Sequence, residues 1–168
     1  PFRSDPEEVE LAKAQALELA GGRIAALPPE GNRLETSRLG TALSAAAVAE
    51  ALPELGKGCG KALQYGFIWA ARLPAALPVY PRGHARQAAG SDSAACRIRV
   101  VNFVTPVSAE DVLGFYATLS TRAGLAPALR READDLVLRG QGKALGFAIH
   151  ARPFEAGLTE VVLVTRER

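Results

Sequence analysis

Hydrophobic residues recur along this chain with two periods, one typical of helices and one typical of strands. Residues 6–20 carry apolar side chains at three- and four-residue spacing, which predicts a helix that begins after Asp5 and ends at Gly21. A second helix is expected over residues 41–52. It lies within an Ala-, Gly- and Pro-rich stretch over residues 21–60, which is otherwise expected to form an extended or partly ordered arm.

The second half of the chain changes to a strand pattern. A β-branched run over residues 97–104 predicts a strand, and a capping-box variant at Ser108 predicts a helix that ends near Gly124. Further strands, separated by glycine- or proline-containing turns, are expected over residues 135–139, 143–151 and 158–166. This order favours an α+β fold: an antiparallel sheet of about four to five strands with one helix packed on a face, preceded by a helical and irregular N-terminal arm.

The two cysteines predict a covalent link within the second region. Cys59 and Cys96 form an even pair, and in an exported chain such a pair is most simply a disulfide. Two unpaired, buried thiols of a cytosolic protein are the alternative. We therefore expect an arm over residues 1–58 and a disulfide-stapled α+β domain over residues 59–168.

Composition changes the picture in three respects. The chain has 168 residues, 48% of them hydrophobic, which is enough apolar material for a core. Its 20 Lys and Arg nearly balance 18 Asp and Glu, and this balance argues against nucleic acid as a partner. The sequence contains no methionine. We therefore expect that an export signal or a membrane anchor preceded Pro1-Phe2-Arg3-Ser4, with N-terminal trimming of a cytosolic protein as the alternative.

No pattern in the sequence indicates catalysis, so no catalytic residue, cofactor or metal is expected. Residues 56–61 are rich in glycine and lysine but lack the spacing of a phosphate-binding loop. His84 and His150 have no partner at metal-ligand spacing. A cysteine held in a disulfide is also excluded as a nucleophile.

A basic and aromatic group of residues is the candidate surface for a ligand or partner. The basic members suit an anionic envelope component, a phospholipid head group or an acidic partner, with a solvated sheet edge as the alternative. Trp69, together with Tyr65 and Phe67 of the same segment, is expected to anchor this segment to the sheet, with an exposed recognition patch as the alternative. The group consists of Trp69, Tyr80, Arg82, His84, Arg86, Arg97 and Arg99.

Several motifs together carry a resemblance to a known group. They are Pro78-Val79-Tyr80-Pro81, the run Val101-x-Phe103-x-Thr105, the run Ser108-x-x-x-Val112-x-x-Phe115-Tyr116, and Ala123-Gly124-Leu125. Over residues 60–166 the chain resembles uncharacterised exported and lipoprotein-like envelope proteins of alphaproteobacteria of the sphingomonad type. The resemblance implies a strand–helix unit, a closing antiparallel meander and an envelope location, and it supplies no catalytic residues.

These observations lead to one leading expectation and one alternative. We expect a non-enzymatic accessory or scaffold domain that contacts a protein partner in the periplasm or outer envelope of a Gram-negative bacterium, tethered to the membrane if the missing segment is an anchor. The alternative is a periplasmic domain that binds a small ligand or glycan, with weak hydrolase activity as a variant. Its pocket is expected between the meander and residues 65–80, lined by Trp69, Tyr80 and Arg82.

Overall fold

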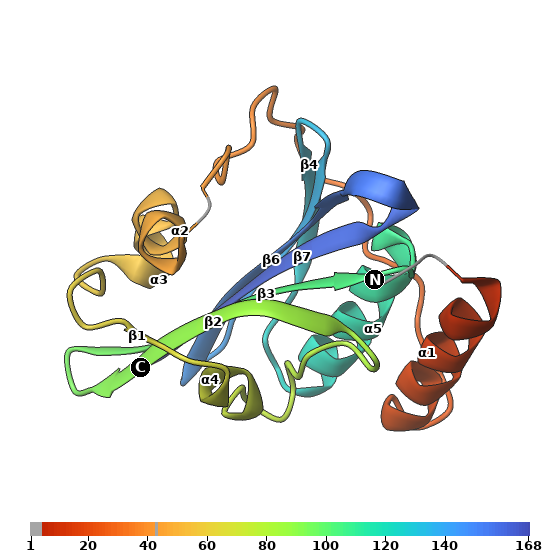
Figure 1. Ribbon diagram of the computed structural model, residues 1–168, viewed down its shortest axis with the longest axis horizontal. Coiled ribbons are helices and arrows are strands. Elements are labelled where there is room, and N and C mark those ends of the chain that lie inside the picture. Colours follow the sequence, from red (N-terminus) through yellow and green to blue (C-terminus); the bar gives the residue numbers. More distant parts are fainter. Residues whose placement is uncertain (1–4, 43) are drawn as a thin grey trace.

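An antiparallel sheet of seven strands forms the centre of the molecule, in the order β1-β2-β3-β7-β6-β5-β4 (Figure 1). The computed structural model describes residues 5–42 and 44–168. The strands are β1 (Gln64–Tyr65), β2 (His84–Ser93), β3 (Cys96–Thr105), β4 (Ala128–Glu132), β5 (Asp135–Gln141), β6 (Leu145–Pro153) and β7 (Thr159–Glu167). β2 and β3 form a hairpin, and β4 to β7 form a meander whose last strand returns to pair with β3.

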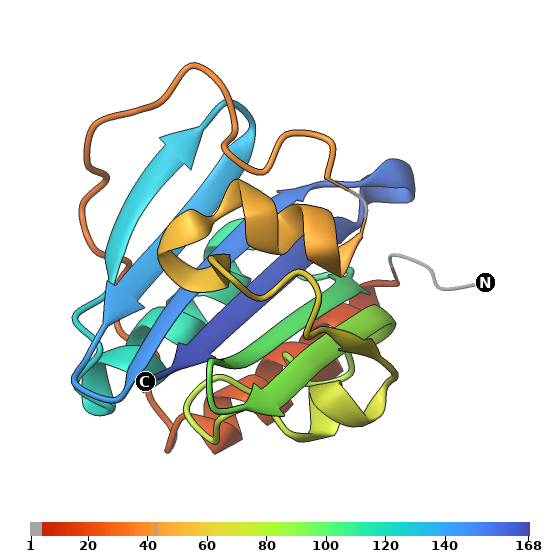
Figure 2. The ribbon, with the colours of Figure 1, turned by 90° about the vertical axis from the view of Figure 1, so that its left-hand side faces the viewer.

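Helices cover both faces of this sheet. They are α1 (Pro6–Leu19), α2 (Ala45–Ala51), α3 (Pro53–Gly56), α4 (Ile68–Ala71) and α5 (Ala109–Arg122), and a short 3-10 turn spans Glu155–Gly157. In Figure 2, α2 lies in front of the sheet, whereas α5 and α1 lie behind it. The result is three layers, with the sheet in the middle.

Each face of the sheet has its own hydrophobic core. One core joins α5, α1 and α4 to the sheet, with Phe103, Phe115 and Phe147 at its centre. The other joins α2 and α3 to the opposite face and includes Leu52, Ile98 and the two cysteines. Residues before the expected boundary at residue 58 enter both cores, through α1 in the first and through α2 and α3 in the second. The strands after it also serve both cores, since their alternate side chains point to opposite faces.

The helix predictions with strong capping signals are confirmed. α1 begins after Asp5, whose Oδ1 accepts a hydrogen bond from Glu7 N at 2.9 Å. α5 begins after Ser108, whose Oγ accepts one from Asp111 N at 3.2 Å. Gly124 adopts φ 76° beyond the end of α5, in the left-handed region that the C-terminal cap requires.

The expected sheet of four to five strands with one helix is wrong, because the structure has seven strands and five helices over its described residues. The predicted strands correspond to β3, β5, β6 and β7, and the missed strands are β1, β2 and β4. β2 consists of small and polar residues without a period-two pattern, and β4 has charged residues at three of its five positions. Pairing with neighbouring strands therefore decides their conformation.

The arm is hydrogen-bonded to the sheet and is not a separate extension. Residues 23–42 form no helix or strand, but Gly31 N donates to Leu129 O at 2.8 Å and Leu34 N donates to Arg131 O at 2.9 Å. The arm therefore runs beside β4 and covers the outer edge of that strand (Figure 2). The predicted helix over 41–52 is shorter than expected and begins after Ser44. Leu43 and the expected mature start, residues 1–4, lie outside the described residues.

Candidate functional site

The register of β2 and β3 divides the predicted basic group into two parts. His84 pairs with Val104, whereas Arg97 pairs with Asp92 at the other end of the hairpin. Seven residues of extended strand separate these ends, roughly 20 Å. The basic residues near the start of β2 and those near the start of β3 therefore do not form one surface.

Trp69 and Arg99 are held inside the protein. Trp69 belongs to α4 and its side chain is buried, and the Arg99 guanidinium lies 4.8 Å from the centre of its ring. The same guanidinium donates to Arg72 O at 3.1 Å and to Ser91 O at 3.0 Å, and it pairs with Asp92 at 2.8 Å. Both side chains therefore anchor α4 to the β2–β3 hairpin, whereas Arg97 remains exposed.

Gly90 provides the space in which Trp69 packs, which leads to a first prediction. A Cβ atom at Gly90 would lie 2.6 Å from Trp69 Cε3 and 2.8 Å from Ile98 O. We expect Gly90→Ala to lower the free energy of unfolding by about 1 to 3 kcal/mol because it overpacks this contact. Urea unfolding followed by Trp69 fluorescence measures the loss. The matched control is Gly60→Ala, where nothing lies within 4 Å, and equal stability of the two variants would contradict the prediction.

Tyr80 lines a groove between α1 and α5. Its ring is buried and meets Phe115 edge-on at 5.2 Å, and burial raises the pKa of its hydroxyl to about 12. The groove has a volume of about 660 Å³ and an apolar wall formed by Leu17 and residues 24–27. Neither Trp69 nor Arg82 lines it, so the three residues expected to share a pocket do not share this one. Arg82 instead forms an ion pair with Glu8 of α1.

A second hollow lies beside α4 and the start of β2. Its volume is about 840 Å³, it is wide open, and its lining includes Phe67, His84 and Arg86. Next to it, Tyr65, Phe67 and Ile68 are 56%, 61% and 54% exposed. We call these three residues the apolar corner. So much large apolar surface within four consecutive positions is characteristic of a contact surface.

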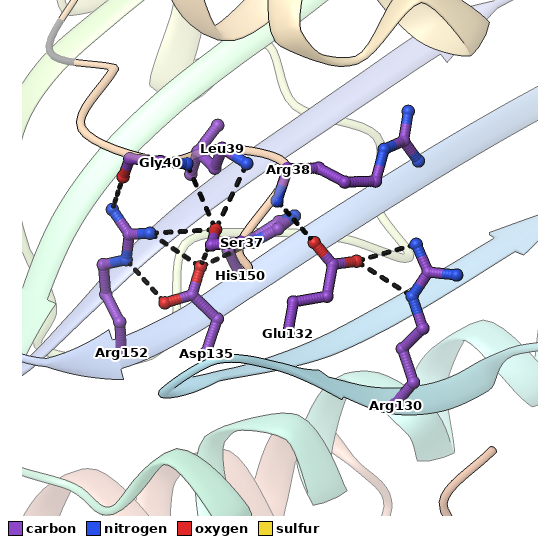
Figure 3. A network of polar contacts seen from close by, with 9 residues as sticks. All are labelled: Ser37, Arg38, Leu39, Gly40, Arg130, Glu132, Asp135, His150 and Arg152. Carbon is purple, nitrogen blue, oxygen red and sulfur yellow. Dashed lines mark hydrogen bonds and ion pairs between the residues drawn. The ribbon is translucent and has the colours of Figure 1, made fainter. Parts of the chain in front are cut away.

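A network of polar side chains fastens the arm to β5 and β6 (Figure 3). Asp135 is its centre: Arg152 donates to both carboxylate oxygens at 2.9 and 2.7 Å, and Ser37 Oγ donates to Oδ2 at 2.6 Å. His150 Nδ1 lies 3.0 Å from the same oxygen. Burial raises the pKa of Asp135, but the hydrogen bonds from His150, Arg152 and Ser37 outweigh burial and lower this pKa to about 2.

A second carboxylate continues the network toward β4. Glu132 is fully buried, and its Oε1 accepts from Arg38 N at 2.9 Å. Its Oε2 accepts from Arg130 Nε at 2.9 Å and lies 2.8 Å from Nη2. The side chain of Arg38 turns outward and forms two hydrogen bonds to Glu54 of α3, at 2.8 and 2.6 Å.

The residue types Ser37, Asp135 and His150 are those of a hydrolase triad, but their geometry differs from one. In a triad the serine hydroxyl donates to the imidazole, and the carboxylate bonds the other imidazole nitrogen. Here the serine hydroxyl and the imidazole both bond the same carboxylate oxygen, and Ser37 Oγ also accepts from the backbone of Leu39 and Gly40 at 3.2 Å. The serine is therefore a turn residue of the arm, and this network holds the arm against β5 and β6.

Sequence reasoning missed the network. Ser37 and Asp135 are 98 positions apart, and His150 and Arg152 are ordinary residues of a strand, so no local pattern joins them. Sequence reasoning favoured Trp69, Tyr65 and Phe67 as anchors of their segment over an exposed recognition patch, and the structure buries Trp69 but exposes Tyr65 and Phe67. The run Tyr65 to Ile68 did carry a signal, since three large apolar residues stand together beside Gly66 outside any helical or strand period.

The disulfide prediction is confirmed, since Cys59 and Cys96 are bonded with their Cα atoms 5.5 Å apart. Among the described residues, no group of three or more His, Cys, Asp or Glu side chains is placed to hold a metal ion. Within residues 5–42 and 44–168, no helix has the length and apolar character that a membrane span requires.

Fold and site together define a disulfide-bonded α+β domain whose buried polar residues hold the structure and whose apolar corner faces solvent. Comparison of the chain with protein-family models, with curated proteins and with solved structures finds no match.

Proposed function

We propose that this chain is a non-enzymatic domain that binds a protein partner, and that the apolar corner is the contact surface. The observation that carries the proposal is the exposure of Tyr65, Phe67 and Ile68, each more than half accessible, beside an open hollow. Aromatic and aliphatic anchors of this kind are enriched at the centres of protein interfaces. The arm is packed on its own domain and supplies no argument for partner contact.

Side chains rather than sheet edges carry this contact. The outer edge of β4 is covered by the arm, and the outer edge of β2 is covered by β1 at Ala89 and Gly90. Beyond β1, the pairing of β2 with β3 shifts between Ala85 and Gln87, and such a bulge interrupts an edge. Addition of a partner strand along either edge is therefore disfavoured.

The charges around the apolar corner specify the partner's surface. Arg72 follows α4, and Arg86 lines the hollow that Phe67 also lines. Their side chains remain 52% and 47% exposed, although they pair with Asp92 and Glu160. The fitting partner is thus a protein surface with an apolar centre and acidic residues at its rim.

The disulfide supports a compartment for this interaction. Structural disulfides persist where the environment is oxidising, as in the bacterial periplasm, and are rare in the cytosol. Together with the resemblance to alphaproteobacterial envelope proteins, the Cys59–Cys96 bond favours the periplasm or outer envelope of a Gram-negative bacterium. We accordingly propose an accessory or scaffold role in an envelope assembly.

The proposal predicts a partner whose binding depends on the apolar corner. The partner is isolated from native envelopes in mild detergent, identified by mass spectrometry and purified, and its affinity is measured by calorimetry. We expect the double substitution Phe67→Ser/Ile68→Ser to weaken binding by at least about tenfold, because it removes two anchors from the interface centre. Folding should be unaffected, since both side chains are largely exposed.

Two control variants make the result specific. Leu19→Ser changes a side chain of α1 that is 59% exposed and lines neither the groove nor the hollow, and it should leave the affinity unchanged. Leu17→Ser changes the wall of the α1–α5 groove, the site on which the small-ligand alternative now rests because Tyr80 lines it. A loss of binding with Leu17→Ser and none at the apolar corner would overturn the proposal in favour of that groove.

A further inference from the structure

Arg139 on β5 has charge and hydrogen-bonding capacity that no residue of the described chain satisfies. Its Nε is buried and has no hydrogen-bond partner. Within the described chain its two terminal nitrogens form no hydrogen bond or ion pair either, but unlike Nε they are not buried. A guanidinium whose charge no carboxylate of the described chain balances can bind an anion at its accessible terminal nitrogens.

The neighbouring charges leave Arg139 as the unneutralised member of a cluster. Arg38 is paired with Glu54, and Arg130 is paired with Glu132, in both cases through two contacts. Three arginines and two glutamates therefore leave one positive charge uncompensated. Burial lowers the pKa of Arg139, and the positive charge of Arg130 lowers it further, so a bound anion would relieve an unfavourable environment.

A small cavity lined by Arg139 opens between α3 and strands β4 to β6. Its volume is about 210 Å³. Most of its wall is apolar or backbone, and the charged residues in the wall are Arg139 and Glu54, of which Glu54 is already engaged by Arg38. The lining residues are Glu54, Leu55, Ala128, Arg139, Gly140, Gln141, Phe147 and Ala148.

We propose that this cavity binds a short-chain monocarboxylate whose two oxygens meet the terminal nitrogens of Arg139. A planar carboxylate matches the fork of a guanidinium through two parallel hydrogen bonds. Its single negative charge balances the one uncompensated positive charge of the cluster. A short alkyl chain fits the apolar wall formed by Leu55 and Ala148, whereas a phosphate ion would make no apolar contact there. The cavity includes no residue of the apolar corner, so failure of one proposal would leave the other unaffected.

Butyrate is the probe that tests this site. Titration of the isotope-labelled chain with sodium butyrate, at ionic strength held constant with sodium chloride, should shift the amide resonances of Gly140, Gln141 and Ala148 with saturation in the millimolar range. Arg139→Gln should weaken this binding at least tenfold, because it removes the charge and the fork. Arg139→Lys keeps the charge without the fork and should bind with intermediate affinity. The matched control is Arg97→Gln, an exposed cation outside the cavity, which should bind butyrate as the natural chain does.

Neutral butyramide separates charge pairing from simple filling of the cavity. It has nearly the same shape, and we expect it to bind at least tenfold more weakly than butyrate. Three results would overturn the proposal: no saturable shift at these amides, butyrate binding that survives Arg139→Gln, or equal binding of butyrate and butyramide. Thermal unfolding keeps the Arg139→Gln result interpretable, since a variant that melts cooperatively is folded.

Discussion

Replacement of Asp135 by alanine will lower the free energy of unfolding by about 3 to 5 kcal/mol, because it removes the anion at the centre of a buried charge network. The substitution leaves the Arg152 guanidinium, the His150 imidazole and the Ser37 hydroxyl without their common partner. Removing one member of a buried pair costs more than the pair contributes, since the remaining charge stays desolvated. Urea unfolding of the variant and of the natural chain measures the difference.

The neighbouring carboxylate provides the control for this experiment. Asp134 is exposed and directly precedes Asp135, so Asp134→Ala changes the same charge at almost the same place without touching the network. We expect it to alter stability by less than about 0.5 kcal/mol. Similar effects of the two substitutions would show that the network contributes no more than surface charge does.

The same carboxylate should make the protein sensitive to acid. Its pKa lies at about 2 in the folded chain against 3.8 for an unperturbed group, so protonation is harder in the folded state. A depressed pKa stabilises the fold fully above pH of about 4, and this contribution of about 2 kcal/mol is lost as the pH falls toward 2. Asp135→Asn should lack that part of the acid transition. An unchanged pH dependence in Asp135→Asn would assign the acid sensitivity to other groups.

Loss of the disulfide is the second large effect. The Cys59–Cys96 bond closes a loop with a sequence separation of 37 and joins the segment after α3 to the start of β3. By loop-closure entropy, a bond of this span stabilises the fold by about 3 to 4 kcal/mol. We expect Cys59→Ala/Cys96→Ala to lose this amount, because alanine fills the buried positions without adding a polar group.

Contacts of Arg166 will confine the loss of stability to the face of the sheet that α2 and α3 cover. Its guanidinium donates to Leu55 O at 2.6 Å and to Ala95 O at 3.0 Å, so it holds the same two segments together without the covalent bond. Hydrogen exchange should therefore show faster opening of α2 and α3 in the double variant, with β5 to β7 still protected.

Reduction of the natural chain provides an independent check. A reductant should shift its urea midpoint to that of the double variant, and it should leave the variant itself unchanged. A loss of less than about 1 kcal/mol on reduction would contradict the prediction and would indicate that packing of α2 and α3 already determines this region.

The parts of the fold that were predicted correctly share a physical property. α1, α5 and β3 are specified by residues next to one another: a capping side chain, an apolar repeat, a β-branched run. The disulfide was predictable because only one pairing of two cysteines exists. In each case the determining interactions are local or have no competitor.

β2 and the basic group show where local patterns fail. The residues of β2 have no strand period, and only hydrogen bonds to β3 and β1 hold that segment extended. The antiparallel register then sets Arg97 roughly 20 Å from His84, although 13 positions separate them in the sequence. The sequence predicts Arg99 as a surface cation, but its strand position directs it under Trp69.

The sequence by itself therefore determined the α+β class, the capped helices, the closing meander and the covalent link, because each depends on short-range periodicity or on residue type. Only the tertiary structure decided the number of strands, the packing of the arm on β4, the network around Asp135, the orphaned Arg139 and the exposure of the apolar corner. These features depend on contacts between residues as many as 115 positions apart, and the free energy of such contacts exists only when the whole sheet has formed.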